Sequence, residues 1–176
     1  MARIAFLLGQ EFEDSEMSEP YEAVRQKGHE AVIVGLKAGE TLKGKQGKAG
    51  YTADKAIGDV KPEEFDAVII PGGSSPENIR LDAGMKKFVT AMLQANKTVS
   101  AVCHGPQLLI SAGLLKGRTI TSVPVLQDDM RNAGATFVDK EVVVDGNLIT
   151  SRTPQDLPAF IRETLHAVEV TNGVRS

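Results

Sequence analysis

Short runs of consecutive apolar residues recur along the chain, separated by segments in which apolar residues return every three or four positions. Runs of four to eight apolar residues, rich in Val and Ile and bounded by turn residues, are typical of strands buried on both faces. We predict such strands at 3–8, 31–36, 66–73 and 97–102, with a shorter strand at 119–122.

The intervening segments have the period of amphipathic helices. Residues 82–95 show it best, because the apolar residues of this segment fall on one helical face. Further helices are predicted at 17–28, 104–112, 124–133 and 154–170. Gly28 is expected to end the first of them in the left-handed conformation that glycine adopts easily.

Two segments break the alternation. Asp145-Gly146 is a strong turn dipeptide and predicts a hairpin over 141–151. Residues 37–58 are rich in Gly and Lys, and we expect a hairpin or an irregular excursion there. The glycines and lysines at 44–50 lack the strand-then-helix context of a phosphate-binding loop.

Buried strands alternating with helices indicate one doubly wound α/β domain over 1–176, a mostly parallel sheet with helices on both faces. Ligands of such sheets bind at the carboxyl ends of the strands. The segments that follow those ends are Gln10–Asp14, Pro71–Glu77, Cys103–Gly105, Ser122–Pro124 and Ser151–Asp156. We expect them to build one site.

Composition narrows the function classes. A chain of 176 residues with a formal net charge of −3 gives no reason to expect nucleic acid or a membrane surface as partner. A single cysteine excludes an intramolecular disulfide and fits a reducing cytoplasm. The N-terminal apolar run is too short for a signal peptide. No cysteine and histidine spacing suits a metal, and no cofactor is expected.

Cys103 lies where a predicted strand meets a predicted helix. A free cysteine is often only a small buried hydrophobe. At a strand-to-helix turn, however, its side chain is exposed at the active edge of the sheet, and the helix N-terminus favours the thiolate. Gly105 permits the tight turn that follows. We therefore interpret Cys103 as a nucleophile.

A nucleophile needs an acid or base beside it. His29 precedes a strand and His166 lies within the last predicted helix, which leaves His104 at the site, although adjacent residues point in different directions. A carboxyl from the acidic segment after the first strand is a second candidate, and the pattern does not distinguish Glu11 from Glu13.

Backbone N–H groups after the third predicted strand lie close to the expected position of the thiol. Those of Gly72 and Gly73, with the N–H of His104, are expected to form an oxyanion hole.

Several segments together resemble the PfpI (ThiJ/PfpI) family of class I glutamine-amidotransferase-like proteins, in its protease I and general stress protein branch. They include "EFEDSE" (11–16), "EEFDAVIIPGG" (63–73), "PENIR" (76–80), "AVCHGPQLLISAG" (101–113) and "VVVDGNLITSR" (142–152). The resemblance covers nearly the whole chain and implies a flavodoxin-like fold.

The resemblance also implies residue roles. It makes Glu13 the carboxyl partner of Cys103 and assigns the oxyanion hole to Gly73 and His104. It places His104 at a subunit interface, where Glu77 of a neighbour completes a Cys-His-Glu set in a homodimer or in a hexamer made of three dimers. Gly72 and Arg152 are expected to bind substrate.

Position 123 departs from the family pattern, since Val123 stands where relatives often carry tyrosine.

Three functions are compatible with this resemblance. The first is a glutathione-independent glyoxalase or deglycase, in which Cys103 adds to the aldehyde of methylglyoxal or acts on its adducts. The second is an intracellular cysteine peptidase. The third is a redox sensor that works through oxidation of Cys103. A small aldehyde or a peptide is therefore the expected substrate.

Overall fold

A computed structural model describes residues 1–175, with side chains through Thr171. Its main sheet has seven strands in the order β10-β11-β7-β6-β1-β2-β5, parallel except for the β10–β11 pair. The strands are β1 (Arg3–Leu7), β2 (Glu30–Gly35), β5 (Lys55–Ala56), β6 (Ala67–Ile70), β7 (Thr98–Val102), β10 (Val143–Asp145) and β11 (Leu148–Ser151).

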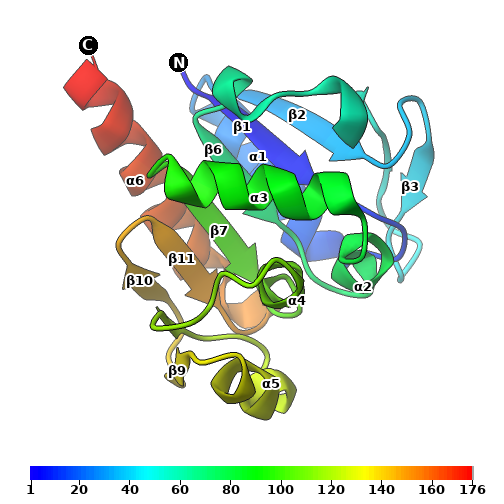
Figure 1. Ribbon diagram of the computed structural model, residues 1–176. Helices are drawn as coiled ribbons and strands as arrows, with labels where there is room; N and C mark the ends of the chain where they lie inside the picture. Colours follow the sequence, from blue (N-terminus) through cyan, green and yellow to red (C-terminus); the bar gives the residue numbers. More distant parts are fainter. Residues whose placement is uncertain (176) are drawn as a thin grey trace.

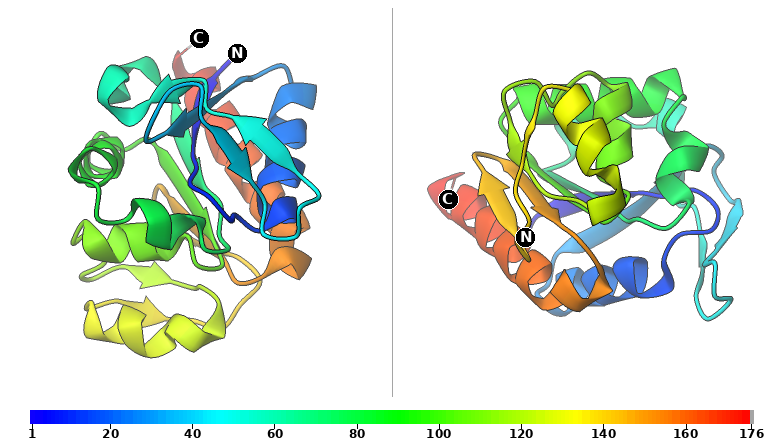
Figure 2. Two further views of the ribbon diagram at one scale, coloured as in Figure 1. Left: turned by 90° about the vertical axis from the view of Figure 1, so that its right-hand side faces the viewer. Right: turned by 90° about the horizontal axis from the view of Figure 1, so that it is seen from below.

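Helices cover both faces of this sheet (Figures 1 and 2). On one face lie α1 (Asp14–Gln26) and α6 (Leu157–Arg175), and on the other lie α2 (Ser75–Ile79), α3 (Ala83–Gln94) and α4 (Pro106–Ser111). Each face has its own apolar core. In β1, Ala5 and Leu7 point into one core while Ile4 and Phe6 point into the other, which explains the continuous apolar runs. The predicted flavodoxin-like α/β fold is confirmed.

The remaining elements lie outside the main sheet. A hairpin of β3 (Thr41–Lys43) and β4 (Gly50–Thr52) confirms the first option for residues 37–58. Helix α5 (Gln127–Asn132) and the pair β8 (Thr119–Ile120) and β9 (Thr136–Phe137) form a layer beyond β10 and β11 (Figure 1). Gly28 has φ +83°, as its capping role requires.

Three predictions of local structure differ from the structure. The strand at 119–122 is shorter and pairs with β9. It does not join the main sheet, because the N–H groups of Thr119 and Thr121 donate to side chains of the β10–β11 hairpin rather than to its backbone. Helix α2 was not predicted. Helix α1 begins at Asp14 rather than at residue 17, and this brings one further acidic residue to the inner face of the helix.

Candidate active site

Cys103 lies at the sharp turn between β7 and α4, with φ +61° in the left-handed region that L-residues rarely adopt. Its N–H donates to the Ser151 carbonyl at 2.9 Å, and its carbonyl accepts from Val123 N–H at 3.0 Å. A Cβ at Gly105 would stand 2.5 Å from the Ile70 carbonyl oxygen, so this position requires glycine. The predicted strand–turn–helix elbow is therefore present, with backbone strain at Cys103, the position that a nucleophile takes in such elbows.

The carboxyl group that faces the thiol belongs to Glu16. This side chain is fully buried, and its Oε1 accepts the Gly72 N–H at 3.0 Å. Oε2 forms no well-aligned hydrogen bond within the described part of the chain, and the carboxyl interacts with the Cys103 thiol. A Cβ at Gly72 would overlap this carboxyl, which is why a glycine separates the two groups.

Burial raises the pKa of Glu16 to about 8, and the charge of Glu13 adds to the effect. At neutral pH, Glu16 is therefore mostly protonated. Burial likewise raises the pKa of the Cys103 thiol to about 12, with the Glu16 charge as second cause. Below pH 8 Glu16 takes up its proton, and its charge then no longer raises the pKa of Cys103. A neutral carboxyl beside a thiol is suited to proton transfer.

These findings correct two expectations. The carboxyl group that interacts with Cys103 is that of Glu16, whereas Glu13 forms an ion pair with Lys45 at 2.9 Å. The pKa of Cys103 is raised rather than lowered, because its 9% exposed side chain is desolvated more strongly than the helix N-terminus can offset. Glu11, the other sequence candidate, is exposed and lies outside this contact.

His104 lies closer to the thiol than the sequence allowed us to expect. Its Nδ1 is 3.4 Å from Cys103 Sγ within the same chain. Burial lowers the pKa of His104, while the charge of Glu77 acts in the opposite direction. Glu77 stands exposed in the first turn of α2. A neutral imidazole next to a thiol is able to receive its proton.

Two backbone N–H groups near the elbow have no carbonyl acceptor among the described residues. Gly73 adopts φ +73°, and its N–H donates to no acceptor within the described residues. The His104 N–H donates to the Cys103 sulfur and to no carbonyl in the described chain. The Gly72 N–H is occupied by Glu16. Of the three N–H groups considered from the sequence, those of Gly73 and His104 remain candidates for an oxyanion hole.

Arg152 makes structural ion pairs. Its guanidinium donates to both carboxylate oxygens of Asp156, at 2.9 and 3.1 Å, and to Asp139 at 2.9 Å. These hydrogen bonds, Asp156 first, raise the pKa of Arg152 further. A guanidinium neutralised by two carboxylates has little charge left for a substrate.

Val123 is half-buried, its N–H is occupied by the Cys103 carbonyl, and its side chain has no hydroxyl to offer the site.

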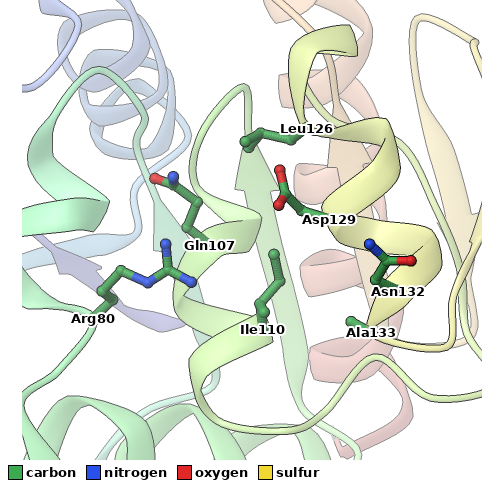
Figure 3. Close-up of a pocket in the computed structure, with 7 residues that line it drawn as sticks. All are labelled: Arg80, Gln107, Ile110, Leu126, Asp129, Asn132 and Ala133. Carbon is green, nitrogen blue, oxygen red and sulfur yellow. The ribbon is translucent and has the colours of Figure 1, made fainter.

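Two hollows contain residues next to the site in sequence or contact, and Cys103 lines neither of them. One, of about 330 Å³, opens between α4 and α5, with Arg80 and Gln107 facing Asp129 and Asn132 (Figure 3). The other, of about 560 Å³, lies beside Glu13 and is lined by α1 and the β3–β4 hairpin. Within the part of the chain that the structure describes, no group of three or more His, Cys, Asp or Glu side chains is arranged to hold a metal ion. The same residues include no helix long and apolar enough to cross a membrane.

Sequence reasoning missed Glu16 and Lys45. Glu16 shares a helical face with Pro20 and Val24, at spacings of four, and this periodicity is visible once the helix is started at Asp14. Lys45 had no such signal, because its place depends on how the hairpin folds back over the site.

Comparison with known proteins supports a single family. The sequence profile of the DJ-1/PfpI family matches residues 2–167. The chain is 51% identical to Protein/nucleic acid deglycase 2 of Escherichia coli over 93% of this chain and 95% of that protein. It is 49% identical to General stress protein 18 of Bacillus subtilis, over 95% and 98% of the two chains. Putative cysteine protease YraA of the same species is 45% identical, over 95% and 98%.

A solved structure gives the same result. A two-domain protein of Anabaena variabilis, with a DJ-1/ThiJ/PfpI-like and a ferritin-like domain, superposes with a TM-score of 0.93 and is 42% identical. The match covers 94% of this chain and 48% of that protein, so this chain spans about half of its length.

Proposed function

Because the chain belongs to the DJ-1/PfpI family, we propose that it is a stress-protective cysteine enzyme of the cytoplasm that removes methylglyoxal or its adducts without glutathione. The observation that carries the proposal is the buried, mostly protonated Glu16 carboxyl beside the Cys103 thiol. That pair suits addition to a reactive aldehyde followed by proton transfer. The names of relatives support a deglycase. We infer the glyoxalase reaction from the groups that surround Cys103.

The first step is addition of Cys103 to the aldehyde. The thiol proton passes to His104, whose Nδ1 is 3.4 Å from Sγ, and the sulfur forms a bond to the aldehyde carbon. The carbonyl oxygen acquires negative charge and accepts hydrogen bonds from the Gly73 and His104 N–H groups. It then takes a proton from Glu16, which gives a neutral hemithioacetal and a Glu16 carboxylate.

The second step moves a proton between neighbouring carbons. The Glu16 carboxylate removes the proton from the former aldehyde carbon, and the His104 imidazolium protonates the adjacent ketone oxygen, which gives an enediol. Glu16 then gives its proton to the second carbon, and the hydroxyl on the first carbon loses its proton to His104, which produces a lactoyl thioester on Cys103. Glu16 is then a carboxylate again, and it regains its proton only during the hydrolysis that follows. Water hydrolyses the thioester, releasing lactate and restoring the thiol.

Lactate formation from methylglyoxal tests this function. The wild type should produce lactate with saturable kinetics, and Cys103→Ala should reduce turnover to the uncatalysed rate. His166→Ala is a matched control, since this histidine lies on α6 away from the site. Undiminished turnover by Cys103→Ala would overturn the thiol mechanism.

A peptidase is the second candidate, favoured by the Cys103–His104 contact within one chain and by the name of YraA. A fluorogenic peptide should then be cleaved with Cys103-dependent kinetics. Signal that disappears on further purification would show a contaminant instead. The redox-sensor reading has less support, because a buried thiol with a raised pKa is oxidised slowly.

We also propose that the site is completed by a second copy of the chain, in a homodimer or in a hexamer made of three dimers. Glu77 is exposed, and its carboxylate forms no hydrogen bond or ion pair among the described residues. Two hydrophobic residues are also exposed. Leu81 follows α2 and is 81% exposed, and Val125 precedes α5 and is 73% exposed. Glu77→Ala should weaken assembly in sedimentation experiments and reduce turnover together. Unchanged assembly and activity would remove Glu77 from the proposal.

A further inference from the structure

The β3–β4 hairpin is fastened to the start of α1 by one carboxylate. Asp14 accepts the backbone N–H groups of Gln46, Lys48 and Ala49 at 2.8 to 2.9 Å. A Cβ at Gly44 would overlap the same carboxylate. The glycine- and lysine-rich loop thus has the backbone cradle of an anion site, and Asp14 fills it. Burial opposes the charge of Asp14, but the hydrogen bonds prevail and its pKa is lowered.

This fastening places Lys45 at the active site. The backbone N–H of Lys45 donates to the Phe12 carbonyl at 2.9 Å, and its ammonium forms the 2.9 Å ion pair with Glu13. Gln46 Nε2 donates to the second oxygen of Glu13, also at 2.9 Å. Glu13 is only 12% exposed, whereas the Lys45 side chain is 46% exposed. The carboxylate is enclosed, and the ammonium keeps N–H donors for another partner.

The connection from Lys45 to the thiol is short. The Glu13 N–H donates to the Gly72 carbonyl at 3.2 Å. A Cβ on Gly72 would stand 3.0 Å from the Cβ of Cys103. Glu13 and Cys103 therefore flank the same glycine, and Lys45 lies on the solvent side of that contact.

We propose that Lys45 makes the Cys103 site selective for electrophiles that carry a negative charge, such as carbonyl compounds with a carboxylate, and for 2-hydroxy carboxylate products. This inference rests on the proposed function, because Cys103 is the reacting atom in both. At neutral pH Glu16 is mostly protonated and His104 is neutral, so the charges that remain near the sulfur are the Lys45 ammonium, its ion-pair partner Glu13 and Glu77. Lys45 is then the cation that an incoming anion meets.

Electrostatics at the site agree with this role. Burial is the largest influence on the pKa of Cys103, Glu16 and His104, and in all three the Lys45 charge acts to lower the pKa. The hydrogen bond to Glu13 raises the pKa of Lys45, which keeps it charged throughout the neutral range.

Alkylation of Cys103 tests the proposal without any turnover. Cys103 is the only cysteine, so the rates with iodoacetamide, which is neutral, and iodoacetate, which is an anion of similar size, report on one atom. Lys45→Met should lower the iodoacetate-to-iodoacetamide rate ratio by about five- to tenfold, as expected for loss of one charge nearby. Lys45→Arg should keep the ratio within about twofold.

Lys48→Met is the matched control, because it removes the same charge from the same loop while its backbone N–H still binds Asp14. It should leave the rate ratio within about twofold of the wild type, as an exposed charge farther away is screened. Two results would overturn the proposal. One is an equal loss of both rates in Lys45→Met, which indicates a structural role only, and the other is an equal change of the ratio in Lys48→Met.

Protection by lactate extends the test to the product. Lactate should slow the iodoacetamide reaction of the wild type and of Lys48→Met, and this protection should be lost in Lys45→Met. Protection that persists in Lys45→Met contradicts the proposal. A shifted alkylation ratio in a protein that fails to turn over methylglyoxal would refute the proposed function and keep the charge selectivity. Turnover of methylglyoxal together with an unshifted alkylation ratio in Lys45→Met would support the proposed function and refute the charge selectivity.

Discussion

Asp14 and Glu16 stand two residues apart in the first turn of α1, and their carboxyl groups are driven to opposite protonation states. Asp14 is held as an anion by three backbone N–H groups, while burial keeps Glu16 mostly protonated, with a pKa of about 8. The Asp14 carboxylate fastens a loop, and the Glu16 carboxyl is the group that we propose to transfer protons. Separated ionisation of neighbouring carboxyls is a pattern of acid–base sites.

Replacing Glu16 should abolish most of the activity without unfolding the protein. Glu16→Gln keeps an acceptor for the Gly72 N–H but removes the transferable proton, so kcat/KM for methylglyoxal should fall by about 100-fold or more. Glu13→Gln is the comparison, and we expect a loss of about tenfold or less. The reverse order of the two variants in a lactate assay would restore Glu13 as the thiol's partner.

The raised pKa of Glu16 predicts the direction of a pH effect on stability. An unfolded chain ionises this group near 4.5, whereas the folded chain retains the proton until about pH 8. The unfolded state therefore binds fewer protons between these values, and the free energy of unfolding should fall as pH rises, by on the order of 3 kcal/mol. Urea unfolding at pH 5 and pH 8 measures this. Glu16→Gln should show a smaller decrease, and an equal decrease in both proteins contradicts the assignment.

Loss of the Asp14 fastening should free the hairpin. Asp14→Ala leaves three backbone N–H groups without their acceptor, and we expect the free energy of unfolding to fall by about 2 kcal/mol. The stabilisation by Asp14 exists above its unfolded pKa of 3.8 and is lost as pH falls through its lower folded value. Hydrogen exchange at Gln46, Lys48 and Ala49 should accelerate before exchange in β1 does. Unaltered protection of these amides would show that other contacts hold the loop.

Backbone strain at Cys103 predicts an unusual order of stabilities. At φ +61° glycine is unstrained and alanine is not, so Cys103→Gly should be more stable than Cys103→Ala by about 1 kcal/mol. Within an ordinary strand or helix the order is the opposite. Denaturant titration of the two inactive variants decides the point, and greater stability of Cys103→Ala would mean that the turn relaxes.

Sequence patterns predicted the scaffold because its signals are local. The continuous apolar runs of β1, β6 and β7 report burial on both faces, and the position of Cys103 between β7 and α4 follows from the chain itself. The carboxyl-edge rule for parallel sheets then brought the right segments together. These inferences needed no knowledge of side-chain orientation.

The chemistry at the thiol was harder to predict for a physical reason. Choosing among the acids at 11–16 depends on where α1 begins, and a shift of three residues changes which carboxyl faces the core. Two opposing effects set the pKa of Cys103. Burial raises it and the helix N-terminus lowers it, and the extent of burial is known only from the three-dimensional structure. Lys45 reaches the site through a hairpin whose contacts are all distant in sequence.

The hydrogen bonds that hold the elbow also determine when the site exists. Cys103 N–H is paired with Ser151 in β11, and its carbonyl with Val123, so the turn is shaped by segments synthesised 20 to 48 residues later. A nascent chain that has emerged only through α4 contains Cys103 but lacks the two hydrogen-bond partners that hold the elbow. Because the chain is synthesised from its N-terminus, the only cysteine reaches its final backbone conformation after most of the fold has been synthesised.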